Sequence, residues 1–227
     1  MVRLSPIPIV IYGTCNWARL LLDELGNDPR YRIAAFACDP EYLDAAEFCG
    51  YLLYDFSEIE RRFPPDQYQM LVCGIYASPR ERSEYYLRAK RKGYACPNFI
   101  SAGALVSPTA SFGENNFIFG GTYIDARCRF GNNTIVRPNV YIGHESVIGD
   151  TVFFAPGCNI ASRCRIGDLS MCCIGSVLIG GLSIGREVLI GAGALMLEDA
   201  ADSGKYLGVP ARRVAEVDPE LGIRMDR

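Results

Sequence analysis

Residues 136–154 read VRPNVYIGHESVIGDTVFF, and the apolar residues of this stretch recur at an interval of six. Val136, Ile142, Ile148 and Phe154 hold the phase, and the phase continues unbroken in both directions. Every sixth residue from 106 to 196 is apolar, and the series comprises Val106, Phe112, Ile118, Ile124, Phe130, Val136, Ile142, Ile148, Phe154, Ile160, Ile166, Cys172, Leu178, Ile184, Ile190 and Met196. Such a period predicts a repeat architecture.

The physical interpretation of the repeat is a β-helix, in which each six-residue unit is one short strand and one turn. The apolar position points inward and stacks on its equivalents in neighbouring coils. The residue two places before it is usually small, as a corner requires. Several of the ten cysteines fit this pattern: Cys128, Cys158 and Cys164 at corners and Cys172 in the core. We therefore expect free, buried thiols and no disulfide framework.

The first hundred residues have a different character, with strands and helices in alternation. Residues 7–12, 33–37 and 70–73 are short apolar runs typical of buried strands. Residues 18–25 have helical periodicity, and Ser78-Pro79 opens a charged helix through residue 91. Residues 94–100 are expected to close the unit. Alternation of this kind predicts a small parallel sheet with helices on its faces.

Composition excludes several classes of protein. The formal net charge is −3, whereas a nucleic-acid binder would carry a basic field. No stretch approaches the roughly 20 apolar residues of a membrane span, and the run at 7–12 is too short for a signal peptide. We expect a cytoplasmic protein. A single histidine, His144, makes a Cys/His metal site unexpected, so no metal is predicted.

The six-residue unit resembles the hexapeptide repeat of left-handed β-helix acyltransferases, in which three units make one triangular coil. This resemblance implies an all-β left-handed parallel β-helix of about five coils at residues 103–227. The preceding residues 1–102 would form an α/β Rossmann-like domain that binds a nucleotide sugar. Over nearly the whole chain, this arrangement is similar to that of the bacterial sugar O- and N-acyltransferases. That family includes bacillosamine and perosamine N-acetyltransferases and sialic acid O-acetyltransferases.

His144 is the first candidate for chemistry, because it stands outside the core two residues after the inward Ile142. A neutral imidazole suits proton removal from a hydroxyl or ammonium nucleophile. Glu145 follows it directly and could orient the ring. The segment IGHESVIGD at 142–150 matches the family segment that carries its His-Glu or His-Asp pair. The resemblance implies that His144 is the general base and Glu145 its polarising acid.

Two positions depart from the family pattern. Phe153 stands where the family commonly has a second histidine that contacts the acyl-CoA, and Arg137 stands where it commonly has an asparagine near the acceptor. Phe153 would either pack between subunits or line a modified donor pocket. Arg137 would either be a solvated charge or contact an anionic part of the acceptor.

The first strand-to-helix turn reads YGTCNWA at 12–18 and keeps only the first glycine of the family's glycine-rich run. NAD binding is therefore not expected. Gly13, Cys15 and Asn16 still place backbone N–H groups at a helix N-terminus. Trp17 would either stack on a base or pack against the β-helix domain. The resemblance implies that Asp39 and Gly74, which follow the next two strands, also contact the nucleotide.

The tail GVPAR at 208–212 resembles a family motif that closes over coenzyme A. Gly208 and Pro210 would form the bend, and Arg212 or Arg213 would either meet a CoA phosphate or be solvated. Ser162, Ile174 and Ala192, with Phe153, complete the expected donor site. The family also places its active sites between neighbouring β-helices, which implies a homotrimer.

The resemblance implies an acyl-CoA-dependent enzyme, with acetyl-CoA or another acyl-CoA as the donor and an amino group of a nucleotide-linked sugar as the expected acceptor. Acetylation of a sugar or sialic acid hydroxyl is the alternative reaction. A non-catalytic β-helix scaffold or binding protein is the alternative outside enzymes, and it is favoured by the loss of the glycine-rich turn. A carbonic-anhydrase-type hydratase would need three histidines for zinc and is excluded by the single one.

Overall fold

The computed structural model describes residues 6–26, 28–74 and 78–224. The chain divides into two compact units. The first comprises residues 1–76 and 84–97, and the second comprises residues 77–83 and 98–227. No helix among the described residues has both the length and the apolar character needed to cross a membrane.

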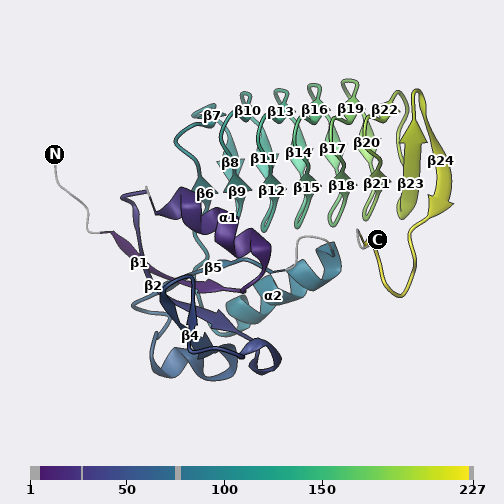
Figure 1. The fold of residues 1–227 in the computed structure, drawn as a ribbon. Helices are drawn as coiled ribbons and strands as arrows, with labels where there is room; N and C mark the ends of the chain where they lie inside the picture. Colours follow the sequence, from purple (N-terminus) through teal and green to yellow (C-terminus); the bar gives the residue numbers. More distant parts are fainter. Residues whose placement is uncertain (1–5, 27, 75–77, 225–227) are drawn as a thin grey trace. The chain divides into compact units, whose positions relative to one another are not determined.

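The first unit is built on a five-stranded sheet in the order β3-β4-β2-β1-β5 (Figure 1). Strands β1, β2, β4 and β5 pair in parallel, and β3 is an antiparallel edge strand. The strand bounds are β1 Ile7–Tyr12, β2 Tyr31–Cys38, β3 Glu47–Phe48, β4 Tyr51–Asp55 and β5 Gln69–Val72. The three predicted strands are thus confirmed, and β3 and β4 are additions that the sequence reading missed.

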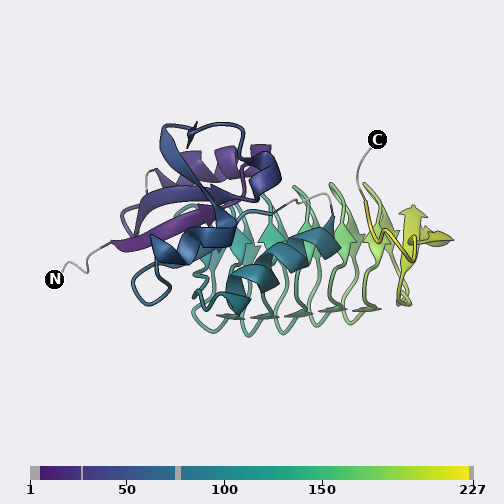
Figure 2. The same cartoon turned by 90° about the horizontal axis from the view of Figure 1, so that it is seen from below.

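Helix α1 (Asn16–Leu25) lies on one face of this sheet, and the part of α2 (Pro79–Arg91) that belongs to the first unit, residues 84–91, lies on the other (Figures 1 and 2). Two short 3₁₀ turns, η1 (Pro40–Tyr42) and η2 (Phe56–Arg61), follow β2 and β4. Alternate residues of β1 face opposite sides of the sheet, so Val10 and Tyr12 join one core with Phe56 and Tyr94. This layering is what a run of strands buried on both faces requires.

The second unit is a parallel β-helix of three sheets, and we call these face one, face two and face three. Face one contains β6 (Phe99–Ile100), β9 (Phe117–Ile118), β12 (Ile135–Val136), β15 (Phe153–Phe154), β18 (Met171–Cys172) and β21 (Leu189–Ile190). Face two contains β7 (Leu105–Val106), β10 (Tyr123–Ile124), β13 (Tyr141–Ile142), β16 (Asn159–Ile160), β19 (Val177–Leu178) and β22 (Leu195–Met196). Face three contains β8 (Ser111–Phe112), β11 (Arg129–Phe130), β14 (Val147–Ile148), β17 (Arg165–Ile166) and β20 (Ser183–Ile184).

The six-residue prediction is confirmed residue by residue, because every predicted inward position is the second residue of a strand in β7 to β22. From β6 to β19, each strand pairs in parallel with the strand 18 residues later, as Ile124 pairs with Ile142 and Ile142 with Ile160. Eighteen residues are three units of six, so each unit supplies one side of one triangular coil. The inward apolar residues of successive coils stack on one another and give the unit a continuous apolar interior.

Small polar residues hold the corners together. The hydroxyl of Ser146 donates to the carbonyl oxygen of Ala161 in the next coil at 3.4 Å, and Ser170 donates in the same way to Gly185 at 2.9 Å. The thiol of Cys164 makes the equivalent contact to Ile179 at 3.2 Å. Burial raises the pKa of the Cys164 thiol, which therefore remains protonated. All ten cysteines are free, and seven of them are buried as expected, whereas Cys15 and Cys173 are partly exposed and Cys49 is exposed. The corner cysteines serve packing.

The β-helix ends in a hairpin that extends face one. Its strands are β23 (Gly204–Gly208), which pairs in parallel with β21, and β24 (Ala211–Glu216), which pairs antiparallel with β23. The segment 94–100, expected to close the first unit, is divided between the two units. Residues 94–97 belong to the first unit, where the Met70 nitrogen donates to the Ala95 carbonyl oxygen at 3.0 Å, whereas Phe99 and Ile100 pair with Phe117 and Ile118 and begin the β-helix.

Candidate functional site

The turns between faces two and three form a column that we call corner 2–3, which comprises residues 125–127, 143–145, 161–163 and 179–181. His144 occupies the middle position of its turn, between β13 and β14, and Ser162 occupies the same position one coil later. Gly143 permits this stacking, because a Cβ atom on it would lie 2.6 Å from the backbone nitrogen of Ser162. The predicted base and one predicted donor contact therefore lie on adjacent turns.

The imidazole of His144 is buried at Nδ1 and partly exposed elsewhere. Its Nδ1 atom is buried and lies 3.5 Å from Oε2 of Glu145, which is near enough for charge attraction but too long for a hydrogen bond. The side chain as a whole is 41% exposed. The exposed part of the ring is thus the part away from Nδ1, and this leaves Nε2 as the nitrogen that can meet a substrate.

Glu145 is held from the preceding coil. Both Nε and Nη2 of Arg127 donate to its Oε1 atom, at 3.1 and 2.9 Å. These hydrogen bonds and the guanidinium charge hold the pKa of the Glu145 carboxyl below its ordinary value. Sequence reasoning missed Arg127. The signal was available in the spacing, since residues 127 and 145 are 18 apart and occupy the same turn position one coil apart.

The other predicted β-helix residues lie at a different corner. Arg137, Ile174 and Ala192 belong to corner 1–2, the column of turns 119–121, 137–139, 155–157, 173–175 and 191–193 between faces one and two. The guanidinium carbon of Arg137 lies 5.1 Å from the centre of the Phe119 ring, and Ile174 is exposed. Arg137 and His144 therefore flank β13 at its two ends, and within one chain they lie on opposite corners of face two.

Phe153 has a packing position. It points outward from face one, but it is only 5% exposed, and the guanidinium of Arg82 lies 5.9 Å from the centre of its ring. Arg82 is itself buried and donates from Nη2 to the carbonyl oxygens of Thr151 and Val152. Burial lowers the pKa of Arg82 to about 9. The outward ring is thus enclosed by the polypeptide itself.

The predicted tail residues lie at the tip of the terminal hairpin. Gly208 has a φ of 97°, a conformation that favours glycine, and it precedes the bend at Pro210. Arg212 is exposed and donates from Nη1 to the carbonyl oxygen of Ala211, the preceding residue, at 3.0 Å. Leu207 and Val209 on the same tip are exposed apolar residues. The hairpin therefore offers both apolar contact and a cationic side chain.

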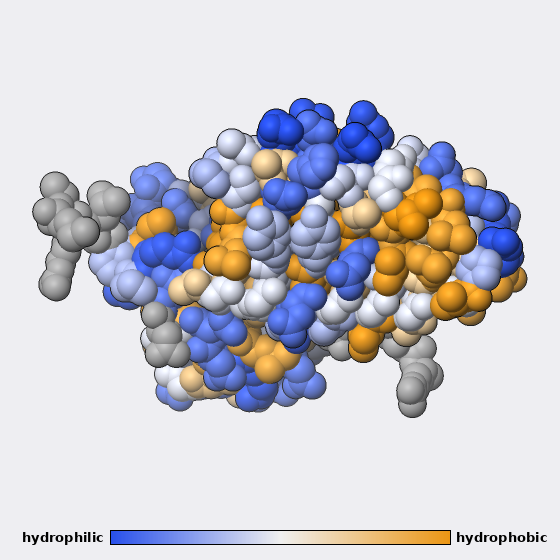
Figure 3. Space-filling view, turned by 90° about the horizontal axis from the view of Figure 1, so that it is seen from above, coloured by the Kyte–Doolittle hydropathy of each residue, from blue (hydrophilic) through white to orange (hydrophobic). Residues whose placement is uncertain are grey.

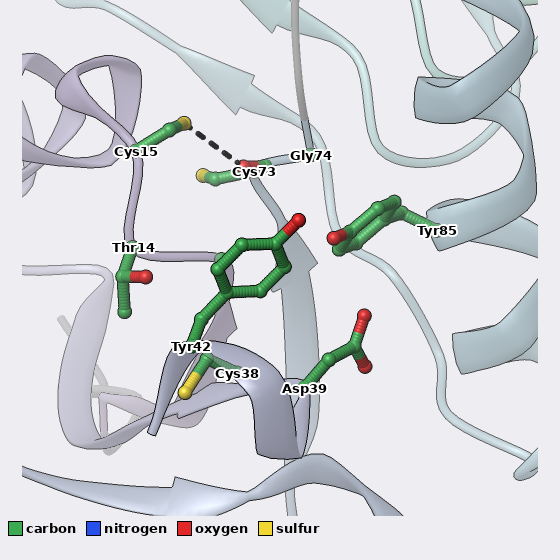
Figure 4. A pocket seen from close by; sticks show the side chains of 9 residues that line it. Thr14, Cys15, Cys38, Asp39, Tyr42, Cys73, Gly74 and Tyr85 are labelled. Atoms are coloured by element: carbon green, nitrogen blue, oxygen red, sulfur yellow. Dashed lines mark hydrogen bonds between the residues drawn. The ribbon is translucent and has the colours of Figure 1, made fainter. Parts of the chain in front are cut away.

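The first unit contains a cavity of about 250 Å³ at the carboxyl ends of β1, β2 and β5 (Figure 4). Four of the six predicted nucleotide-binding residues line it, namely Gly13, Cys15, Asp39 and Gly74. Tyr42 and Tyr85 also line it, although the sequence reading did not identify them. Their rings enclose the cavity opposite the Cys15 side chain, which donates to the carbonyl oxygen of Cys73 at 3.4 Å. Asn16 and Trp17 lie outside the lining, and Trp17 is buried at 3% exposure.

Gly13 is indispensable to the shape of this cavity. Its φ is +120°, and a Cβ atom would lie 2.3 Å from the carbonyl oxygen of Cys73 on the neighbouring strand. The close backbone approach between β1 and β5 therefore requires glycine at this position.

Asp39 is committed to partners inside the unit. Its carboxylate accepts from the Tyr12 hydroxyl at 2.7 Å and from both terminal nitrogens of Arg88, at 2.8 and 2.5 Å. Burial opposes ionisation, but the hydrogen bonds from Arg88 and Tyr12 outweigh it and lower the pKa of Asp39. The Asp39 carboxylate therefore holds the wall of the cavity in place through its bonds to Tyr12 and Arg88. Among the described residues, no cluster of His, Cys, Asp or Glu side chains could hold a metal ion.

The outer surface of face two is mostly apolar. Its outward residues include the exposed Leu105, Tyr123, Tyr141 and Val177, with the exposed polar Asn159 between the last two. Face three is more polar, since it presents Ser111, Arg129, Arg165 and Ser183 at the equivalent positions, with the half-buried Val147 among them. Figure 3 views the molecule from above and shows apolar side chains gathered over the β-helix. An exposed apolar stripe of this kind marks an interaction surface.

Comparison with solved structures supports the fold. The perosamine N-acetyltransferase PerB from Caulobacter crescentus, in complex with CoA and GDP-perosamine, matches with a TM-score of 0.83 and 24% identity over 92% of this chain and 97% of that one. The acetyltransferase domain of PglB from Neisseria gonorrhoeae, in complex with acetyl coenzyme A, matches with a TM-score of 0.83 and 21% identity over 92% and 100% of the two chains. WeeI from Acinetobacter baumannii matches with a TM-score of 0.72 and 18% identity over the same shares.

No family model and no curated protein matches the sequence. The structural likeness nevertheless extends over both units, and it confirms the resemblance inferred from the repeat and the N-terminal alternation. The chain therefore has the fold of the hexapeptide-repeat sugar N-acetyltransferases: an N-terminal parallel sheet with helices, followed by a left-handed parallel β-helix.

Proposed function

We propose that the protein transfers an acetyl group from acetyl-CoA to an amino group of a nucleotide-linked sugar. The observation that carries this proposal is the His144–Glu145 pair at corner 2–3, with Nδ1 turned toward a carboxylate and the rest of the ring open. A histidine held in this way is suited to remove a proton from a nucleophile. It also stands at the edge of the apolar face two, where a neighbouring copy would complete a groove.

In the proposed reaction the amino nitrogen of the sugar attacks the thioester carbonyl carbon directly. A C–N bond forms, the C–S bond breaks, and the pair of electrons leaves with the sulfur of coenzyme A. The Nε2 atom of His144 takes the proton that the nitrogen loses, and this proton can then pass to the departing thiolate. Glu145 stabilises the imidazolium that forms in between.

The proposed active site requires a second copy of the chain. His144 and the predicted donor contacts Ile174 and Ala192 lie on opposite corners of face two, so one protomer alone cannot enclose a ligand with both. A homotrimer that packs through face two would set corner 2–3 of one protomer against corner 1–2 of the next. Ser162, Gly208, Pro210 and Arg212 would contribute further donor contacts. Because Phe153 is enclosed by its own chain, it is omitted from this proposed site.

The nucleotide of the acceptor is proposed to bind in the cavity of the first unit. Gly13, Cys15 and Gly74 supply close backbone approach, and Tyr42 supplies an exposed aromatic ring. The proposal is supported by the solved structures of similar fold, one of which contains CoA and GDP-perosamine and another acetyl coenzyme A. Arg137 is proposed to contact an anionic part of the acceptor.

The test is a panel assay with acetyl-CoA and UDP-, GDP- and dTDP-linked sugars, each as the amino sugar and as its hydroxyl counterpart. Release of free coenzyme A is the readout, and mass spectrometry of the product assigns the acetylated atom. We expect turnover with one amino sugar. Turnover only with a hydroxyl sugar would make the protein an O-acetyltransferase. Absence of turnover, together with no thermal stabilisation by acetyl-CoA or by any of these sugars, would favour a non-catalytic scaffold.

A further inference from the structure

Three charged residues occupy the same turn position in successive coils of corner 2–3: Arg127, Glu145 and Arg163. All three have a left-handed backbone, with φ of 58°, 62° and 62°. Their turns are bonded to one another, since the nitrogen of Glu145 donates to the Ala126 carbonyl at 2.9 Å and that of Arg163 to the His144 carbonyl at 2.9 Å. The side chains therefore project from a rigid backbone ladder at a fixed spacing.

The two arginines are not equivalent toward Glu145. Arg127 gives two hydrogen bonds to Oε1, while Oε2 is left facing Nδ1 of His144 at 3.5 Å. Arg163, one coil on the other side, makes no hydrogen bond or ion pair with Glu145 among the residues that the structure describes. One carboxylate is thus shared between a permanent cation and the imidazole, and the second cation stands outside this arrangement.

We propose that Arg127 is a positioning residue for the acyl-transfer site, acting on His144 through Glu145. This inference rests on the proposed function of His144 as the base. Arg127 holds the carboxylate by one oxygen and partly balances its charge, so that Glu145 orients the imidazole without binding the imidazolium strongly. A base that releases its proton readily to the departing thiolate needs that balance.

Several charged residues surround His144, so a test must separate the direct effect of each charge on the imidazole from an effect that acts through Glu145. Asp125 and Arg127 lie on the turn of the preceding coil, Glu145 on the same turn, and Arg163 on the turn of the following coil. Removing either arginine deletes a positive charge near the ring and so favours imidazolium to some extent. Only Arg127 is expected to act through Glu145, and this difference is measurable.

Because His144 is the only histidine of the chain, its imidazole gives a single NMR titration curve that needs no assignment. In Arg127→Gln we expect the midpoint of that curve to rise by about half a pH unit or more, since the unshared carboxylate then stabilises imidazolium. In Arg163→Gln, the matched control, we expect less than half of that rise. In the Glu145→Gln background, Arg127→Gln should produce a rise no larger than that of the control.

A midpoint that is unchanged or lower in Arg127→Gln would overturn the proposal, and so would an equal rise with and without Glu145. Circular dichroism of each variant checks that the β-helix is retained. Activity is a separate readout: the acid limb of the pH–rate profile should move upward with the NMR midpoint. If His144→Ala retained turnover, the proposed function would fail while the NMR coupling stood. If the coupling were absent and turnover required His144, only the role of Arg127 would fail.

Discussion

The rings of Tyr123 and Tyr141 stack on the outer side of face two, with centroids 5.9 Å apart and an angle of 22° between their planes. The two residues are direct partners in neighbouring parallel strands, so their spacing is set by the backbone. Both rings nevertheless remain substantially exposed, and exposed Leu105 extends the stripe beside Tyr123, whereas the polar Asn159 separates Tyr141 from exposed Val177. A rigid apolar stripe with this exposure is suited to burial against another copy of the chain.

The first prediction follows from this stripe. Light scattering of the wild type should give a trimer, and Tyr141→Glu should give mainly monomer, because it buries an unpaired charge at the contact. Turnover should fall with the loss of assembly, since the proposed site is shared between copies. Arg165→Glu, on the outward side of face three, is the control and should remain trimeric. A monomeric wild type would refute the shared-site model.

The second prediction concerns His144. His144→Ala should lower the turnover rate by about 10²- to 10⁴-fold, the usual effect of removing a general base. The thermal midpoint and its rise with acetyl-CoA should change little, because the side chain is 41% exposed and belongs to a turn between two strands. Arg129→Ala, an exposed residue on face three, should match the wild type in every respect. Near-normal turnover of His144→Ala would remove the chain's only histidine from the mechanism.

The third prediction is a pH dependence. Glu145→Gln replaces a carboxylate that favours imidazolium with a neutral amide, so the pKa of the base should fall. The acid limb of the pH–rate profile reports that protonation and should therefore shift to lower pH. The loss of turnover at neutral pH should be smaller than that of His144→Ala. A profile that stays in place would make Glu145 a structural residue of its turn.

The fold of the second unit could be predicted almost completely, because the apolar residues whose burial stabilises it recur at a single interval of six. A residue such as Cys172 looks anomalous alone, but the phase identifies it as inward, and it is fully buried. The expectation that residues 94–100 close the first unit holds for 94–97 but not for 98–100, and the reason is physical. An apolar run bounded by turns reads the same whether its strand joins one sheet or another, and Phe99 and Ile100 pair with the β-helix.

The candidate site was predictable only where its parts are adjacent in sequence or repeat in register. His144 and Glu145 stand side by side and were identified directly. Arg127 was not, although the 18-residue coil length that emerges from the repeat would have pointed to it. Tyr85 and Arg88 approach Asp39 from a helix that is distant in sequence, since Arg88 lies 49 residues after Asp39. No local sequence pattern predicts such a contact.

The fourth prediction tests the acceptor contact of Arg137. Arg137→Asn should raise the KM for the nucleotide sugar by about tenfold, the loss expected for one charge-assisted contact, and leave the KM for acetyl-CoA unchanged. Arg129→Asn is the matched control, since it removes an equal charge from face three. An unaltered acceptor KM would make Arg137 a residue that serves its own chain, where its guanidinium lies over the Phe119 ring.

The fifth prediction uses the buried pair that fixes the cavity wall. Asp39 has a lowered pKa, so its ion pair with Arg88 stabilises the fold above the unfolded pKa of about 3.9 and loses that effect as the pH falls through the folded pKa. Asp39→Asn should lower the free energy of unfolding by about 1–3 kcal/mol at pH 7, less than the loss of a fully buried pair because Arg88 is 32% exposed. The difference from wild type should shrink toward pH 3.

Trp17, the only tryptophan, belongs to the first unit, so its fluorescence during urea unfolding follows that unit. Glu58→Gln breaks the exposed pair with Arg61 and should change stability by less than about 0.5 kcal/mol at either pH. A cost of Asp39→Asn that is equal at pH 7 and pH 3 would show that the carboxylate charge contributes nothing and that only its shape is needed.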